Sequence, residues 1–275
     1  MNFVQRLERA WAAADTLLCV GLDPDPARLP KNLAAASHPL FEFGRAIVDA
    51  TADLVCAFKP QIAYYAAARA EDQLEMTIAH IRRHHPGIPV ILDAKRADIG
   101  STAEMYAKEA FERYQADAVT VNPYLGFDAL APFLAHADKG VIVLCRTSNP
   151  GAREVQDLDS KGRKLYEVIA EKAARDWNAN GNVLLVVGAT YPEELARIRA
   201  IVGDMPILVP GVGAQGGDVA AVVANGATAA GTGLIISSSR AVLYAGLGAD
   251  YAEATRSAAQ KLRDEINLCR KTKSA

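Results

Sequence analysis

The sequence predicts an α/β protein built as a (β/α)8 TIM barrel, with extra helices at its N- and C-terminal ends. Short runs typical of β-strands alternate with longer segments of helical periodicity, which predicts βα units around a parallel sheet. Eight such runs occur in 275 residues, close to the roughly 250 that a single barrel takes. An open doubly wound sheet would favour fewer strands and a GxGxxG turn after the first one. The first turn, Gly21-Leu22-Asp23-Pro24, lacks that motif.

The expected elements follow one another without a linker, so we predict a single domain over residues 1–275. We expect strands at residues 17–23, 55–60, 89–95, 118–122, 140–146, 183–188, 206–210 and 227–231. The clearest amphipathic helices cover residues 41–53, 73–84, 102–114, 164–178 and 193–202, and the extra end helices cover 2–14 and 251–270. The polar segment 147–162 is long enough to form a mobile active-site loop.

Composition excludes several classes of protein. Hydrophobic residues make up 51% and charged residues 23%, and 30 basic against 32 acidic side chains leave a net charge of -2. This balance argues against disorder, a nucleic-acid-binding surface and a polybasic membrane surface. The apolar runs are far shorter than the roughly 20 residues of a membrane span. Residues 1–14 carry Arg6, Glu8 and Arg9 and lack the long uncharged stretch of a signal peptide. We therefore expect a soluble protein that is not exported.

Cysteines and histidines show no metal-binding spacing, so no metal site is predicted. The four cysteines are widely spaced, which favours buried thiols in a reducing cytoplasm over a disulfide framework; they are Cys19, Cys56, Cys145 and Cys269. The five histidines form no zinc or triad pattern; they are His38, His80, His84, His85 and His136. The adjacent His84 and His85 precede Pro86 and are expected on a solvated helix end.

Charged residues gather at the C-terminal ends of the first three expected strands, where barrels carry their chemistry. The third strand ends in Asp93 and Lys95, which strand periodicity places on one face. The second ends in Lys59, the first in Asp23, and Asp98 follows the third closely. Lysines and carboxylates are rarely buried unless paired, so we predict an alternating Lys/Asp array rather than core packing. A plain salt bridge closing the barrel top is the structural alternative for Asp93 and Lys95.

The last two strands indicate a phosphate site, which is common at this position in barrels. The seventh expected strand enters the glycine-rich segment 210–218, whose backbone N–H groups could approach an anion. The eighth leads through residues 231–233 to three serines and Arg240, a serine-rich helix start with a cation. A surface salt bridge is the alternative role for Arg240.

These residues resemble the orotidine 5'-phosphate decarboxylase family, in particular its longer bacterial form, the type 2 subfamily. The main motif is Asp93-Ala94-Lys95-Arg96-Ala97-Asp98-Ile99-Gly100-Ser101-Thr102. Matching segments occur in the family's order at residues 21–24, 58–60, 121–124, 147–152, 210–217 and 238–240, and cover most of the chain. The segment after Gly151 is longer than in the shorter members of the family.

The resemblance implies decarboxylation of orotidine 5'-phosphate (OMP) to uridine 5'-phosphate (UMP) in pyrimidine biosynthesis, with no cofactor. It implies a catalytic set in which Lys95 donates the proton; the set is Lys95, Asp93, Asp98 and Lys59. It also implies substrate contacts by Asp23, Ile99, Thr102, Ser148, Pro210, Gln215 and Arg240. Within these, Asp23 holds a ribose hydroxyl, Ser148 contacts the base, Gln215 links base and phosphate, and Arg240 grips phosphate. A homodimer is implied, in which Asp98, Ile99 and Thr102 reach across the interface.

Three alternatives remain at this point. Magnesium-dependent sugar-phosphate relatives, 3-keto-gulonate 6-phosphate decarboxylase and hexulose-phosphate synthase, share the DxKxxD core. A Schiff-base aldolase also uses a strand-end lysine, although two neighbouring aspartates oppose the neutral amine that it needs. A phosphosugar-binding barrel without catalysis has little use for a Lys/Asp array.

Overall fold

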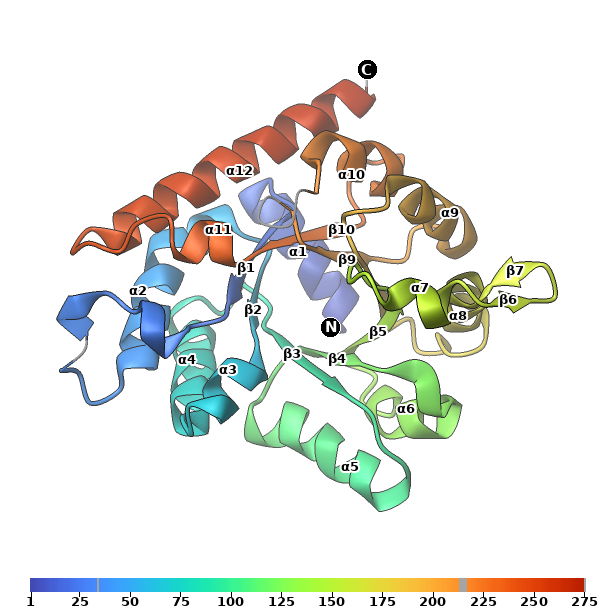
Figure 1. Cartoon of the computed structure of the whole chain (residues 1–275), viewed down its shortest axis with the longest axis horizontal. Coiled ribbons are helices and arrows are strands. Elements are labelled where there is room, and N and C mark those ends of the chain that lie inside the picture. The colour runs from blue at the N-terminus through green and yellow to red at the C-terminus, as the bar shows by residue number, and fades with distance from the viewer. Residues whose placement is uncertain (34, 213–216, 275) are drawn as a thin grey trace.

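Eight parallel strands close into a barrel in the computed structural model, which describes residues 1–33, 35–212 and 217–274 (Figure 1). The strands are β1 (Leu18–Leu22), β2 (Ala57–Pro60), β3 (Ile91–Arg96), β4 (Ala118–Val121), β5 (Gly140–Arg146), β8 (Val183–Val187), β9 (Ile207–Pro210) and β10 (Leu234–Ser238). They pair in the order β2-β1-β10-β9-β8-β5-β4-β3. Parallel bridges from Phe58 to Val90 and from Gln61 to Asp93 join β2 to β3 and complete the ring. The predicted barrel class is confirmed.

Helices surround the barrel and connect successive strands (Figure 1). They are α2 (Pro39–Thr51), α3 (Ile62–Ala67), α4 (Glu71–His84), α5 (Gly100–Lys108), α6 (Phe127–Leu134), α8 (Leu165–Arg175), α9 (Pro192–Val202), α10 (Val219–Gly226) and α11 (Arg240–Leu243). Short 3-10 turns occur at Pro26–Arg28, Lys31–Leu33, Ala52–Leu54 and Pro123–Leu125, and a π turn at Glu109–Arg113. The expected helix at 102–114 therefore begins earlier and ends in this π turn.

The two extra helices are α1 (Phe3–Ala14) and α12 (Tyr251–Ser274), as the sequence predicts. The side chains of Asn2 and Gln5 form a capping box that begins α1. Arg6 of α1 pairs with Asp117, which directly precedes β4, so α1 covers the N-terminal end of the barrel. Helix α12 packs along α2 and α10. The opposite, C-terminal end of the strands stays open for chemistry.

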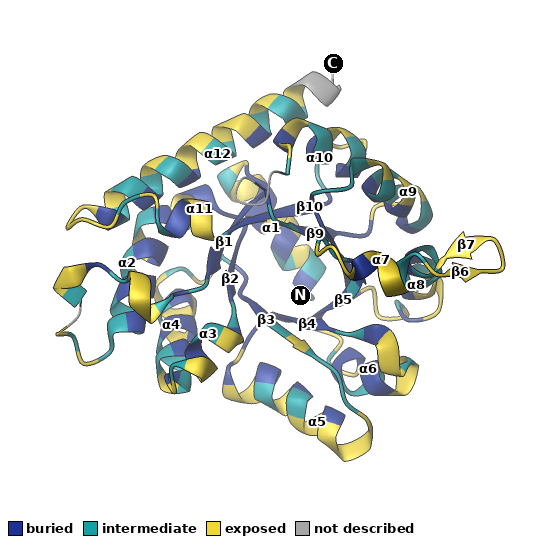
Figure 2. Ribbon diagram, in the orientation of Figure 1, coloured by how far each residue is buried: buried dark blue, intermediate teal, exposed yellow. Residues whose placement is uncertain are grey.

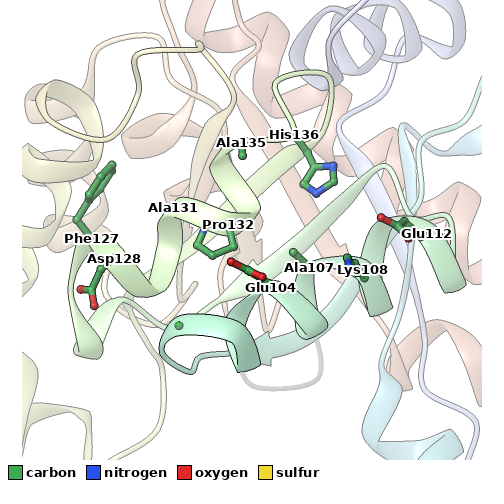
Figure 3. Close-up of a pocket in the computed structure, with 11 residues that line it drawn as sticks. Glu104, Ala107, Lys108, Glu112, Phe127, Asp128, Ala131, Pro132, Ala135 and His136 are labelled. Carbon is green, nitrogen blue, oxygen red and sulfur yellow. The ribbon is translucent and has the colours of Figure 1, made fainter.

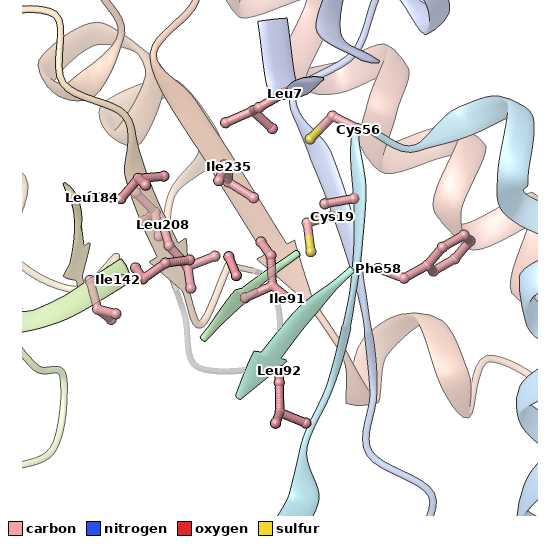
Figure 4. Packing of buried hydrophobic residues seen from close by; sticks show 14 of the residues in the cluster. Leu7, Cys19, Cys56, Phe58, Ile91, Leu92, Ile142, Leu184, Leu208 and Ile235 are labelled. Atoms are coloured by element: carbon pink, nitrogen blue, oxygen red, sulfur yellow. The ribbon is translucent and has the colours of Figure 1, made fainter. Parts of the chain in front are cut away.

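Apolar side chains from all the strands fill the barrel (Figure 4). Cys19, Ile91, Ile142, Leu208 and Ile235 are 0–1% exposed and come from five different strands. The barrel strands are buried along most of their length, with Lys95 at the end of β3 exposed, and most other exposed residues lie on the outer faces of the helices and in the loops (Figure 2). This core holds the strand ends in fixed positions.

The eighth strand was predicted in the wrong place. Residues 227–231 form a turn in which the Thr228 N–H donates to the Thr232 carbonyl, and the strand is β10, Leu234–Ser238. The run Leu234-Ile235-Ile236 has the stronger β propensity, whereas 227–231 is rich in alanine. As a consequence, Ser237 and Ser238 belong to the buried strand and not to a helix start.

The segment 147–162, expected as a polar loop, contains regular structure. It includes α7 (Ala152–Gln156) and β6 (Asp159–Ser160), which pairs antiparallel with β7 (Arg163–Lys164). This hairpin projects from the barrel beside α8 (Figure 1). None of the helices among the described residues is both long and apolar enough to cross a membrane.

Candidate active site

Three charged side chains meet where β2 and β3 end. Lys59 Nζ lies 2.8 Å from Asp93 Oδ2, and Lys95 Nζ lies 2.5 Å from Asp93 Oδ1. Lys59 and Asp93 are buried, whereas the Lys95 side chain is 47% exposed. Two ammonium groups therefore share one carboxylate; the Lys95 side chain is the more exposed of the two lysines, whereas Lys59 lines the cavity described below. The structure brings together three of the four predicted catalytic residues.

The direction of Lys95 is set by a bulge in β3. The pairing of β3 with β4 shifts between residues 92 and 96, so Asp93, Ala94 and Lys95 lie opposite Thr120. The Thr120 hydroxyl accepts hydrogen bonds from the N–H groups of Ala94 and Lys95, at 3.0 and 2.9 Å, and donates to Asp93 Oδ1 at 2.9 Å. Lys95 has a φ of 48°, a left-handed conformation that costs energy for a residue with a side chain. Thr120 offsets that cost.

Thr120 was missed by the sequence analysis, which placed Asp93 and Lys95 on one face by regular strand periodicity. They do converge, but through the bulge. A threonine in an apolar strand gives no signal by itself, because its role depends on the register between β3 and β4.

The electrostatics of the array keep Lys59 and Asp93 charged. Burial opposes ionisation of Asp93, but the ammonium groups of Lys59 and Lys95 hold the pKa of its carboxyl well below the usual range. Burial likewise opposes the charge of Lys59, but Asp93 and then Asp23 raise its pKa above the usual value. Lys59 and Asp93 therefore present fixed charges near neutral pH.

A cavity of about 150 Å³ adjoins this array on the side of β9 and β10. Its lining comes from the ends of β1, β2, β3, β9 and β10 and consists of Asp23, Lys59, Asp93, Pro210, Gly211, Val212, Ser237, Ser239 and Arg240. The predicted positions Asp23, Pro210 and Arg240 thus share one cavity with the charged array. Gln215 lies outside the described residues.

Two polar groups of this cavity lack a partner within the described part of the chain. Asp23 Oδ1 is buried and accepts no hydrogen bond there. Arg240 is the exposed first residue of α11 and makes no ion pair there. An unsatisfied buried oxygen costs roughly 1–3 kcal/mol, so a hydroxyl donor from a ligand would fit beside Asp23.

Gly21 leaves room for the serine that faces this cavity. A Cβ atom at Gly21 would lie 1.9 Å from Ser239 Oγ. Any larger residue in this position of β1 would displace Ser239, which lines the cavity next to Arg240. The glycine in Gly21-Leu22-Asp23 therefore serves the cavity rather than a turn.

The remaining predicted residues lie around the rim. Asp98 lies between β3 and α5, and its Oδ1 accepts the Ile99 N–H at 2.8 Å. It makes no contact with the array within the described chain. Ile99 and Thr102 are exposed, at the start of α5. Their predicted role in substrate binding therefore stays a prediction.

Ser148 follows β5 and packs closely against the end of β8. A Cβ at Gly188 would lie 2.9 Å from Ser148 Cβ, so the two chain segments touch. The preceding residue is tied down as well, because Thr147 N–H donates to Gln156 Oε1 at 2.9 Å and Gln156 Nε2 donates to Thr147 Oγ1 at 2.8 Å. Ser148 thus lies in an anchored segment.

A fully buried arginine, which the sequence analysis also missed, anchors the same segment. Arg146 pairs with Glu194 of α9 through Nε at 2.5 Å and Nη2 at 3.1 Å, and its Nη1 lies 3.2 Å from Asp157 Oδ1. The rings of Tyr166 and Tyr191 lie 5.4 and 5.0 Å from its guanidinium carbon. Arg146 therefore connects the end of β5 to α9 and to Asp157, which follows α7.

Residues 16–255 match the family described as Orotidine 5'-phosphate decarboxylase / HUMPS. The chain belongs to this family. Among its relatives, orotidine 5'-phosphate decarboxylase of Azoarcus sp. (strain BH72) is 65% identical over 270 residues, covering 98% of this chain and 100% of that protein. The protein of the same name from Ralstonia pickettii (strain 12J) is 64% identical over the same shares. The solved OMP decarboxylase of Leishmania donovani has a TM-score of 0.85 at 40% identity, covering 98% of this chain and 99% of that one.

The family assignment made from the sequence motifs is thereby confirmed. The match includes β1 through β10, and with them the array on β2 and β3 and the cavity beside it. Orotidine 5'-phosphate decarboxylases are carboxy-lyases, so the family also confirms the expected enzyme class.

Proposed function

We propose that this chain decarboxylates OMP at C6, giving UMP and CO2 for pyrimidine biosynthesis, without a metal or organic cofactor. The observation that carries the proposal is the Lys59–Asp93–Lys95 array beside a cavity that also contains Asp23 and Arg240. The names of the curated relatives, which are 60–65% identical over nearly the whole chain, support the same substrate.

In this proposal Lys95 supplies the proton. The bond from C6 to the carboxylate carbon breaks, the electron pair stays on C6, and the Lys95 ammonium transfers a proton to C6 as CO2 leaves. One charge at about 4 Å with an effective dielectric near 20 contributes roughly 4 kcal/mol, which is nearly a thousandfold in rate. Asp93 orients the Lys95 ammonium and faces the substrate carboxylate. Lys59 holds Asp93 in place through the hydrogen bond to Asp93 Oδ2.

The rest of the cavity binds the parts of the substrate that do not react. Arg240 contacts the phosphate, Asp23 accepts a ribose hydroxyl, Ser148 and Gln215 contact the base, and Pro210 begins the phosphate loop. Binding energy from the phosphate would then be used at the reacting centre.

We further propose a homodimer in which Asp98, Ile99 and Thr102 complete the partner's site. Large apolar side chains are exposed next to these residues; they are Ile99 at 59%, Met105 at 52%, Tyr124 at 79%, Leu125 at 44% and Phe127 at 52%. Between α5 and α6 lies a groove of about 680 Å³, whose lining includes Glu104 of α5, Phe127 of α6 and His136, which follows α6 (Figure 3). Exposed apolar residues gathered in this way are typical of protein interfaces, and we assign this one to a second copy of the chain.

The dimer has a direct test. Lys95→Ala and Asp98→Ala variants, each inactive alone, should regain activity when mixed, because one composite site then carries both intact residues. Sedimentation should show a dimer. Failure of the mixture to regain activity, with mixed dimers present, would contradict the shared site.

We also propose that residues 1–275 form one domain located in the cytoplasm. α1 contributes Phe3 and Leu7 and α12 contributes Ile266 to the same core as the strands, which supports one folding unit. None of the four cysteines forms a disulfide within the described chain, and burial raises the pKa of Cys19 to about 12, so it is unreactive. Free thiols of this kind suit a reducing compartment.

The decisive experiment follows the ultraviolet absorbance of OMP mixed with the purified protein in excess EDTA. We expect absorbance loss at catalytic protein concentrations. No loss from folded protein that binds UMP would overturn the proposal, and magnesium-dependent turnover of a 3-keto-gulonate 6-phosphate would identify the rival activity in the same family.

A further inference from the structure

A cluster of three side chains that can act as metal ligands, Asp49, His80 and His85, lies far from the barrel mouth. His80 Nε2 lies 2.6 Å from Asp49 Oδ1, and His85 Nε2 lies 3.0 Å from the same oxygen. One ligand atom from each residue lies within 4.8 Å of the other two. The spacing of the histidines in the sequence does not predict this cluster, because its third member, Asp49, comes from a different helix.

The cluster lies at the N-terminal end of the barrel. Asp49 is in the last turn of α2, shortly before β2, and His80 and His85 are at the end of α4, shortly before β3. Helices that connect parallel strands run opposite to them, so their C-terminal ends lie where the strands begin. The cluster is thus separated from the Lys95 site by the length of the barrel.

The two helices hold the cluster in a fixed frame. They lie side by side (Figure 1) and pack against each other. Near the start of α4, Gln73 Oε1 accepts the N–H groups of Leu40 and Phe41 at 2.9 and 3.1 Å, which fixes the beginning of α2. The helices are therefore joined at both ends, and the His80 side chain is only 12% exposed. Little rearrangement is needed to collect three ligand atoms around one ion.

We propose that Asp49, His80 and His85 form a binding site for a divalent transition-metal ion of the zinc type. Two imidazole nitrogens and one carboxylate oxygen are ligands that Zn²⁺ prefers, with water completing the coordination. The ion replaces the hydrogen bonds that both histidines now make to Asp49. It acts on stability by joining α2 to α4, and takes no part in chemistry at Lys95.

Neighbouring charges set the strength of this site. Arg45 Nη1 lies 3.9 Å from Asp49 Oδ2 and opposes a cation, but its guanidinium is held mainly by Glu42, at 2.7 Å. The His84 ring lies against that of His80, with 4.5 Å between centroids. Arg45 acts on the other carboxylate oxygen, so Asp49 Oδ1 stays available as a ligand.

The test uses tag-free protein stripped with EDTA and then dialysed. Zn²⁺ binding is measured against a chromophoric chelator at neutral pH, and Co²⁺ absorption reports the ligand geometry. We expect one Zn²⁺ per chain, and binding at least about tenfold weaker in His80→Gln, His85→Gln and Asp49→Asn. His38→Ala, at the opposite end of α2, is the matched control and should bind like the wild type. Zn²⁺ at about one hundred times Kd should raise Tm by about 5 °C.

The outcomes separate this site from other zinc ligands. Binding that persists unchanged in a His80→Gln/His85→Gln double variant would overturn the proposal and indicate another ligand such as Cys269. Absence of binding to the folded wild type would also overturn it. The glutamine variants should keep normal turnover of OMP, so their folding can be verified independently of metal.

Discussion

The two halves of the barrel mouth differ in whether their polar groups already have partners within the described parts of the chain. At β2 and β3 every charge of the array is paired, because Asp93 binds Lys59, Lys95 and Thr120. At β1 and β10 the buried Asp23 Oδ1 has no hydrogen-bond partner, and Arg240 has no ion pair, in the described parts of the chain. The first half is preorganised, whereas the second has polar groups left for a ligand.

This difference indicates a division of labour. Preorganised charges stabilise a transition state without reorganising during the reaction. Unpaired polar groups favour ligand binding, because a ligand that hydrogen-bonds to them removes the desolvation cost of a buried polar group without a partner. Changes in the two halves should therefore affect different kinetic constants.

The largest effect is expected from Lys95→Ala. Loss of the proton donor should lower kcat on the order of 10³-fold or more, while the Kd for UMP changes only a few-fold because the cavity around Asp23 and Arg240 remains. Stopped assays with OMP and titration with UMP give the two quantities. Activity near that of the wild type would remove Lys95 from its proposed role.

The buried ion pair predicts a pH-dependent stability. Asp93→Asn leaves the buried Lys59 charge without its partner and should destabilise the fold by roughly 3–5 kcal/mol at neutral pH. The folded-state pKa of Asp93 is lowered, so its contribution is present above the unfolded value of about 3.8 and is lost as pH falls below it. Urea unfolding should therefore show a constant difference in free energy of unfolding between the wild type and the variant above about pH 5, and a difference that narrows progressively between about pH 4 and about pH 2. A constant difference over this range would mean that Asp93 is not held by its lysines.

Arg240→Ala tests the other half of the mouth. Loss of two charge-assisted hydrogen bonds to phosphate should lower kcat/KM by about 10²–10³-fold and leave Tm unchanged, because Arg240 is exposed and makes no ion pair within the described chain. Arg28→Ala is a control, since Arg28 stacks on Tyr244 nearby at 3.8 Å. Unchanged turnover in Arg240→Ala would reject the phosphate assignment.

Most of the fold and the charged array could be predicted from the sequence, because both depend on local patterns. Strand ends with Asp or Lys are visible in a sequence, and barrel topology brings them together. The eighth strand was misplaced because two short candidate runs lie within a dozen residues of each other, and periodicity alone does not separate them.

The supporting residues could not be predicted, because their roles depend on contacts between distant elements. Thr120 acts through an irregular register between two strands, and Arg146 through pairing with Glu194, 48 residues away. Asp49 meets His80 only when α2 packs on α4. Such residues carry no motif, and only the folded chain reveals them.

The smallest effect is expected from Thr120→Val, and it tests whether the preorganised half depends on one hydroxyl. Valine keeps the shape of the side chain but removes the hydroxyl that accepts from the Ala94 and Lys95 N–H groups and donates to Asp93. The hydrogen bond to the charged Asp93 alone is worth roughly 1.5–3 kcal/mol. We expect kcat to fall by about 10–100-fold with KM nearly unchanged, because the phosphate side is intact. Thr120→Ser should restore kcat to within about threefold, since it returns the hydroxyl. If Thr120→Val raised KM and left kcat unchanged, the bulge would be serving substrate binding, and the division between the two halves would fail.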